Sequence, residues 1–303
     1  MTSDRIPGSL RKIVLAAAAY FLGQSIAWPL VGATSIKPPN LPSVESPTLT
    51  IAWFALSTLI ISAGVVGVAT DIRGGLWARW AITAALIYFL YTAGTAIELT
   101  VFTKFEGQAY LALAGILPAI ACALVTVRLN ETAPAFRSNL RFDGSMAGRL
   151  AVCWLAYPVV YFFFGSLISP FVLEDYMDDS SMLTVPSLSM LMGVLAIRST
   201  IFLLPSIAVI ERWQANRMRL WLVLGWSHSA LVGLAGLVMP NPVLSPKLRL
   251  VHAVEISADS FAYAGILVLV LTAGTARGVA GTTGKEASTG SEGDLDSTLP
   301  ADD

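Results

Sequence analysis

Long apolar stretches, separated by short polar connections, run along most of this chain. A helix of about 20 apolar residues crosses the hydrocarbon core of a bilayer, because each residue adds about 1.5 Å. Pro118, Pro158 and Pro205 fall inside such stretches, and kinks are expected there. The pattern predicts an all-α polytopic membrane protein with eight transmembrane helices. They cover residues 12–31, 49–69, 77–100, 108–127, 150–170, 187–210, 220–239 and 250–275.

The composition agrees with a bilayer as the solvent of this chain. Hydrophobic residues make up 55% of its 303 positions and charged residues 13%, and the mean hydropathy is +0.69. Soluble domains carry about 25% charged residues, so this chain has too little polar surface to be one. The formal net charge of −1 leaves no basic surface for nucleic acid. The lipid bilayer is therefore the expected partner, while the oligomeric state stays open.

The lysine and arginine residues predict the orientation of the spans. Cytoplasmic loops of membrane proteins are enriched in these two residue types. One set of segments, which includes both termini, holds 14 of the 19, and Arg198 lies inside a span. The opposite loops hold four of them: Lys37, Lys104, Lys247 and Arg249. The chain is therefore predicted to be a multi-pass protein of the cell membrane with cytoplasmic N- and C-termini.

The first apolar stretch has a second interpretation as a secretory signal peptide. Arg11 and Lys12 precede the apolar run, and the small residues of 31–33 follow it, as at a cleavage site. The run is long for a signal peptide, and it has a counterpart later in the chain. A retained transmembrane helix is therefore favoured.

An internal repeat relates the two halves of the chain. Two short matches support it. Residues 73, 76 and 77 match 217, 220 and 221 at an offset of 144, and residues 114–117 match 264–267 at an offset of 150. Slowly rising offsets are what small loop insertions produce, so we expect a tandem duplication of four helices. Because four is even, both copies cross the membrane in the same direction, as in parallel transporter repeats. The most specific match pairs Tyr20, Phe21, Ser25, Pro29 and Val31 with Tyr161, Phe162, Ser166, Pro170 and Val172 at an offset of 141.

The repeat and the composition together predict four parts. Residues 1–128 form the first four-helix repeat, 129–148 a cytoplasmic connection, and 149–275 the second repeat with the polar site. Residues 276–303 are rich in Gly, Ser, Thr and acidic residues and contain no aromatic residue. Such a segment cannot bury enough apolar surface to fold. It is expected to be a disordered acidic tail, which leaves open a cytoplasmic protein partner.

Three ionisable residues are predicted to lie near the middle of the membrane. Arg198, His228 and Asp259 each fall about ten residues from the same end of their spans, on the order of 15 Å deep. Unpaired, Arg198 and Asp259 together would cost roughly 5–7 kcal/mol. We therefore expect these two residues to be in contact or to share a partner. The aligned positions of the first half are apolar or small, which favours a function over packing alone.

The last span carries a polar stripe. His252, Glu255, Asp259 and Tyr263 occupy positions i, i+3, i+7 and i+11, so they share one helix face about 80° wide. With Arg198 and His228 they form the predicted polar intramembrane site. A metal site from His252, Glu255 and Asp259 is a minor alternative, because one stripe needs a second helix to close it. His228 lies about 12 Å deeper than His252 and is not expected to join it.

The first half offers one acidic residue of the same kind, Glu98, near the end of its span. Since its side chain can reach water from there, it is expected to snorkel rather than to pair. Enzyme signatures are missing, because His252 and Glu255 have the wrong spacing for the HExxH zinc motif and no phosphate loop occurs. No cofactor is expected, the catalytic residues are unknown, and a role other than catalysis is favoured.

Three functions remain open from the sequence. The leading one is a transporter-like or ion- or proton-coupled membrane protein, in which Asp259 and His228 carry a proton and the partner is an unidentified small solute or ion. The second is an intramembrane enzyme that acts on a lipid or lipid-linked substrate, with His252 and Glu255 as acid–base groups near the outer leaflet. The third is a non-catalytic membrane subunit or sensor, in which Arg198 and Asp259 form a structural lock.

Overall fold

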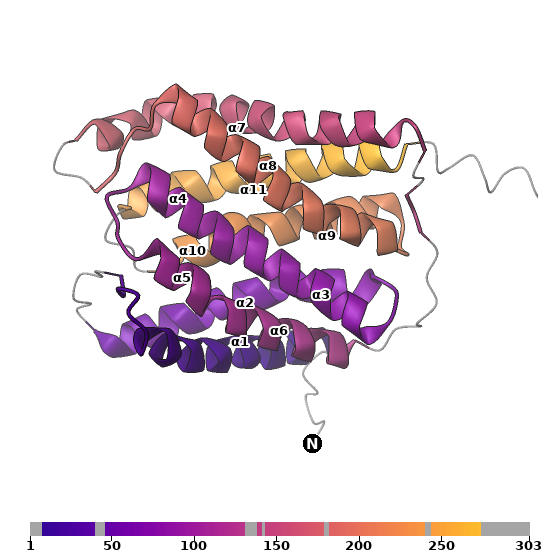
Figure 1. Ribbon diagram of the computed structural model, residues 1–303, viewed down its shortest axis with the longest axis horizontal. Coiled ribbons are helices and arrows are strands. Elements are labelled where there is room, and N and C mark those ends of the chain that lie inside the picture. Colours follow the sequence, from indigo (N-terminus) through magenta and orange to yellow (C-terminus); the bar gives the residue numbers. More distant parts are fainter. Residues whose placement is uncertain are drawn as a thin grey trace, which may run out of the picture. The chain divides into compact units, whose positions relative to one another are not determined.

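The computed structural model describes residues 8–39, 46–130, 138–140, 143–178, 182–239 and 244–273. This part of the chain is helical, and it contains eight helical segments long and apolar enough to cross a membrane (Figure 1). The predicted all-α class and number of spans are confirmed, and the architecture is consistent with an integral membrane protein. The predicted acidic tail, 276–303, lies outside the described residues.

Five of the eight segments are single helices, and three are interrupted. The third span joins α3, η1 and α4, the fourth joins α5 and α6, and the seventh joins α9, η2 and α10. Both η segments are π-helical, so their hydrogen bonds reach back five residues instead of four. The bounds are α1 Gly8–Gly32, α2 Pro47–Asp71, α3 Leu76–Leu86, η1 Ile87–Ala93, α4 Gly94–Phe102, α5 Gln108–Ala114, α6 Ile116–Leu129, α7 Met146–Met177, α8 Leu188–Arg212, α9 Arg217–Ser229, η2 Ala230–Leu234, α10 Ala235–Leu237 and α11 Pro246–Leu271.

Local sequence explains where several helices begin. The side chains of Ser46, Ser187, Asn216 and Ser245 each accept a hydrogen bond from a backbone N–H of the first turn, at α2, α8, α9 and α11. Proline follows two of these caps, where a missing N–H costs nothing. Before α7, the hydroxyl and amide of Ser145 hold the pKa of Asp143 below its usual range.

Pro118, Pro158 and Pro205 occupy two kinds of position inside their spans. Pro158 and Pro205 lie within the continuous helices α7 and α8. The fourth span is instead divided at Gly115, so Pro118 falls in the first turn of α6, where its missing N–H is tolerated. The fifth span runs 32 residues to Met177, beyond the predicted end at 170. This extension carries Tyr176 to the end of the bundle, where it contributes to the site described below.

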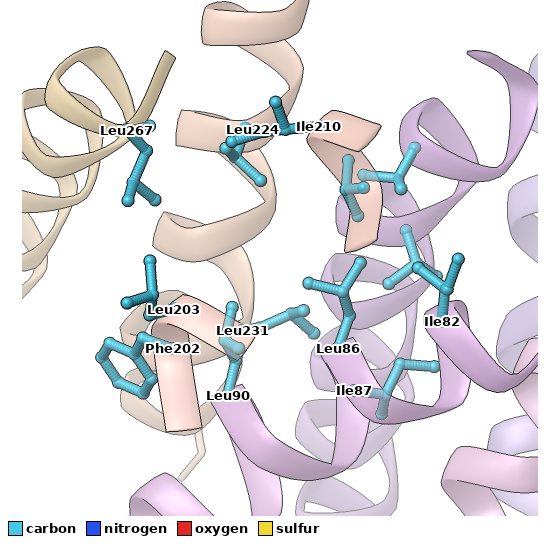
Figure 2. Packing of buried hydrophobic residues seen from close by; sticks show 14 of the residues in the cluster. Ile82, Leu86, Ile87, Leu90, Phe202, Leu203, Ile210, Leu224, Leu231 and Leu267 are labelled. Atoms are coloured by element: carbon cyan, nitrogen blue, oxygen red, sulfur yellow. The ribbon is translucent and has the colours of Figure 1, made fainter. Parts of the chain in front are cut away.

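The helices pack in a regular order. Helix α1 packs against α6 and α2, and α11 packs against α7 and α9 (Figure 1). Between these groups, α2 contacts α9, while α8 contacts α3, η1 and α4. Helix α1 buries Ala16 and Tyr20 in this arrangement, so it packs as part of the bundle. The largest buried apolar cluster of the described residues draws on all eight spans and includes Leu90, Leu203 and Leu231 (Figure 2).

Backbone hydrogen bonds tie the connections together at both ends of the bundle. At one end, the Arg73 amide donates to the Arg212 carbonyl (3.0 Å), and the Gln214 amide donates to the Asp71 carbonyl (3.2 Å). We call this the Arg73 end. At the other, the Lys104 amide donates to Met182 and the Thr184 amide to Phe102, both at 2.9 Å. We call this the Thr184 end.

Helix α1 approaches α6 so closely that one position admits only glycine. A Cβ added at Gly23 would lie 2.7 Å from the Cα of Pro118, which is backbone and cannot rotate away. We expect Gly23→Ala to lower the melting temperature of the purified protein, although alanine is otherwise the better helix former by roughly 0.5–1 kcal/mol. Gly193→Ala in α8 is the control, since nothing lies within 4 Å of its added Cβ. Equal melting temperatures for the two variants would contradict this packing.

Candidate functional site

A cavity of about 260 Å³, largely apolar but lined by several ionisable side chains, lies among the third, fifth, sixth, seventh and eighth spans. Thr103, Leu183 and Leu244, from connections between helices, line one part of it, while Asp259 lines it within α11. The cavity therefore extends from the Thr184 end into the bundle. One water occupies about 30 Å³ in the liquid, so the space is sufficient for a small solute. Its ionisable and phenolic lining residues are Glu98, Tyr161, Tyr176, Arg198, His252, Glu255 and Asp259.

Arg198 of α8 pairs with Glu98 of α4. The Nη2 of Arg198 donates to Oε1 of Glu98 at 2.7 Å, with 4% and 31% of the two side chains exposed. Among the described residues no salt bridge joins Arg198 to Asp259, so the direct contact, one of the two expected arrangements, is not found. Glu98 does not simply snorkel to water, as its position near a helix end suggested. Depth along a helix could be estimated from the sequence, but the face that each helix turns toward its neighbours could not.

Three aromatic rings surround the Arg198 guanidinium. Its Cζ lies 5.6 Å from the ring centre of Tyr157, 5.9 Å from that of Tyr161 and 5.2 Å from that of Phe202. Aromatic faces attract a cation, and the attraction grows when water is excluded. The charge of Arg198 is thus held by one carboxylate and by rings from α7 and α8. This packing fixes the cation in the wall of the cavity.

His252 and Glu255 form a second pair in the cavity wall. The Nδ1 of His252 lies 2.8 Å from Oε2 of Glu255, one turn further along α11. Because an ionised carboxylate only accepts hydrogen bonds, Nδ1 must carry the hydrogen. In the neutral ring, Nε2 then has a lone pair. That nitrogen is buried and has no hydrogen-bond partner among the described residues, so it is left to act as an acceptor.

Asp259 is the one carboxylate of this set without a cationic partner in the described part of the chain. Asp259 accepts a long hydrogen bond, 3.3 Å, from the hydroxyl of the neighbouring Ser260. It lines the large cavity and also a second, much smaller one of about 10 Å³. Asp259 therefore separates the two cavities.

His228 and Tyr263 belong to the small cavity, together with Asp259. His228 is 1% exposed, and its Nε2 lies 2.9 Å from the hydroxyl of Ser206 in α8. The six predicted site residues are thus divided. Arg198, His252, Glu255 and Asp259 line the large cavity, whereas His228 and Tyr263 lie behind Asp259. As expected from the helix rise, the two histidines do not meet.

Two further observations complete the description of the site. Within the ranges that the structure describes, no three His, Cys, Asp or Glu side chains are placed to hold a metal ion together, so the metal alternative gains no support. Sequence reasoning did not single out Tyr161 and Tyr176 as lining residues. A usable signal for Glu98 existed, since it is the sole acidic residue predicted within the spans of the first half.

Comparison with known proteins gives no relative to reason from: no protein-family model, curated protein or solved structure matches this chain. Its function must therefore be argued from the cavity and the side chains that line it.

A double-mutant cycle tests the pairing of Arg198. We expect the destabilisations of Glu98→Gln and Arg198→Gln to be non-additive, with a coupling of about 1–3 kcal/mol, because the two side chains are in direct contact. Arg198→Gln and Asp259→Asn should be closer to additive. Unfolding of the purified protein in detergent measures both cycles. A larger coupling to Asp259 than to Glu98 would show that the functional partner of Arg198 is the other carboxylate.

Proposed function

We propose that this protein is a transporter-like membrane protein that binds a small cationic solute in the large cavity and couples its binding to the protonation of Asp259. One observation carries the proposal: a carboxylate without a cationic partner lines a solute-sized cavity inside the bundle. A buried charge without a partner is costly in a membrane. Asp259 must therefore hold a proton or face a cation, and exchange between these two states is the basis of coupling.

The polar groups of the cavity favour a ligand that donates hydrogen bonds. Glu98 is engaged by Arg198, and Glu255 by His252. Of the ionisable groups, the carboxylate of Asp259 and the lone pair of His252 Nε2 remain, and both are acceptors. An ammonium group supplies three donors and one positive charge. Tyr176 also lines the cavity, and aromatic rings attract cations. A small primary amine therefore fits the site better than an anion does.

The predicted orientation places the cavity on the outside of the cell. Its entrance residues lie at the Thr184 end, next to Lys104, which belongs to the lysine-poor set of loops. By the same assignment the Arg73 end is cytoplasmic. The cavity would thus receive its solute from outside, and the form described is the one accessible from that side.

Three local features support the proposed duplication of a four-helix unit. At the Arg73 end, residues 71 and 73 correspond to 212 and 214 at an offset of 141. Each of the two backbone hydrogen bonds is therefore the counterpart of the other. The same offset relates the five-residue hydrogen bond from Gly94 to Phe89 with that from Ala235 to Ala230. It also relates two serine caps, at 46 and 187. Two parallel repeats, 1–128 and 149–275, would be related by an axis along the membrane normal. This offset of 141 is three residues smaller than the offset of 144 that matches 77 with 221.

A second candidate, an intramembrane enzyme acting on a lipid-linked substrate, rests on the His252–Glu255 pair. A carboxylate that holds one imidazole nitrogen and leaves the other free is the arrangement of an oriented general base. An enzyme of this kind accounts for His252 and Glu255 but gives no role to Asp259. We therefore rank it second.

Binding is tested by thermal stabilisation of the purified protein. Methylammonium and ethanolamine should raise its melting temperature, and acetate should not. At a hundred times its Kd a ligand stabilises by about 2.7 kcal/mol, which corresponds to a shift of several degrees. Asp259→Asn should abolish the shift, whereas Glu211→Gln, in α8 and outside the cavity lining, should keep it. Equal shifts with acetate and methylammonium would contradict a cation site.

Transport is tested in vesicles that contain the purified protein. An imposed proton gradient should drive accumulation of radiolabelled methylammonium above that of protein-free vesicles, and Asp259→Asn should reduce it to the protein-free level. Glu211→Gln is again the control. If no accumulation occurs but the vesicle lipid is chemically altered in a manner that His252→Gln abolishes, the enzyme is the correct function and transport is not.

A further inference from the structure

The small cavity behind Asp259 contains a polar atom that lacks a partner. The hydroxyl of Tyr263 in α11 is buried without a hydrogen bond, and its side chain is 2% exposed. Leaving such a group unpaired costs about 1–3 kcal/mol. Tyr263 lines the cavity together with His228 and Asp259. A partner placed in this cavity would remove the cost.

The size and lining of the cavity select that partner. A volume of about 10 Å³ is close to the minimum for one water molecule. Apolar cavities of this kind stay empty, but a water with two to four polar partners is stable. Tyr263, Asp259, Ser260 and His228 supply the polar side chains, while Val160, Phe202 and Val232 exclude further water.

The hydrogen bonds of Ser206 determine what His228 offers to this cavity. The Ser206 hydroxyl donates to the carbonyl of Phe202 at 2.7 Å. The single hydrogen of this hydroxyl is therefore used. Its oxygen must then accept a hydrogen bond from His228 Nε2, which lies 2.9 Å away. In the neutral ring Nδ1 then carries the lone pair. His228 is thus ready to accept a hydrogen bond, or a proton, at its other nitrogen.

We infer that one water molecule occupies the small cavity, is held by Tyr263, and links Asp259 to His228 Nδ1. When Asp259 loses its proton, the carboxyl O–H donates to the water oxygen while a water O–H transfers to Nδ1. The products are the Asp259 carboxylate and the His228 imidazolium, and the water is regenerated. The reverse transfer restores both groups. This function of the water rests on the proposed protonation of Asp259, but its presence does not.

Other groups face the imidazole from each neighbouring helix. Tyr157 comes from α7, Ser206 and Phe202 from α8, and Asp259 and Tyr263 from α11. Asp259 is the one carboxylate among them. His228 can therefore exchange a proton with Asp259 through the water, and the buried tyrosines hold the water in place.

Nuclear magnetic resonance of the full chain in lipid nanodiscs tests the inference. The chain contains two histidines, so labelling histidine with ¹⁵N gives two sets of ring signals, which His252→Gln assigns. For His228 we expect a protonated Nε2, an unprotonated Nδ1 and magnetisation transfer from water to the ring. Tyr263→Phe should abolish the transfer. Tyr176→Phe, which removes a hydroxyl from the large cavity alone, should not.

Two outcomes overturn the inference: no transfer from water to His228 in the unaltered protein, or the same transfer in Tyr263→Phe. If Tyr263→Phe does not fold, Val232→Ile, which enlarges a lining side chain, serves in its place and should also abolish the transfer. The experiment needs no transport. A His228–water signal without amine accumulation would end the proposed function alone, and accumulation without the signal would end this inference alone.

Discussion

A buried arginine in an apolar bundle is the constraint on which the rest of the site depends. Arg198 is 4% exposed, so its charge must be met by protein groups rather than by water. Glu98 and three aromatic rings meet it, and they come from the third, fifth and sixth spans. The pair joins the two halves of the chain. It also uses the carboxylate of Glu98, which leaves Asp259 without a salt bridge to Arg198.

The sequence predicted the position of a residue along its helix better than the neighbouring helix that the residue faces. The number of helices long and apolar enough to span, and the separation of His228 from His252, follow from hydropathy and the helix rise, and the structure agrees with both. The partner of Arg198 did not follow, because it depends on which helices are neighbours and which faces they present. The π-helical segments had no cue either, since residues 87–93 and 230–234 contain no proline.

A purely structural lock explains part of the site and not the whole. The Arg198–Glu98 pair would serve it well, because buried pairs can specify which helices pack together. A lock, however, needs neither a cavity of about 260 Å³ nor an unpaired carboxylate at its wall. Those two features cost stability, and structures retain such costs most often at functional sites. The evidence for a function is therefore that Glu98 has a cationic partner while Asp259 has none among the described residues, more than that charged residues are present.

The π-helical segment η1 has a consequence for how such a protein can change in evolution. A wide turn holds one more residue than an α-helical turn, so every later residue of the span is rotated by about 100°. Glu98 follows η1 on the same helix and faces Arg198 in this rotated register. Loss of a single residue from 87–93 would let the span close into a regular α-helix and keep the carboxylate on the face of the arginine, whereas an α-helical turn formed without that loss would turn the carboxylate away. In a related chain, the counterpart of Glu98 would have to be sought by helix face, since its aligned position would differ by one.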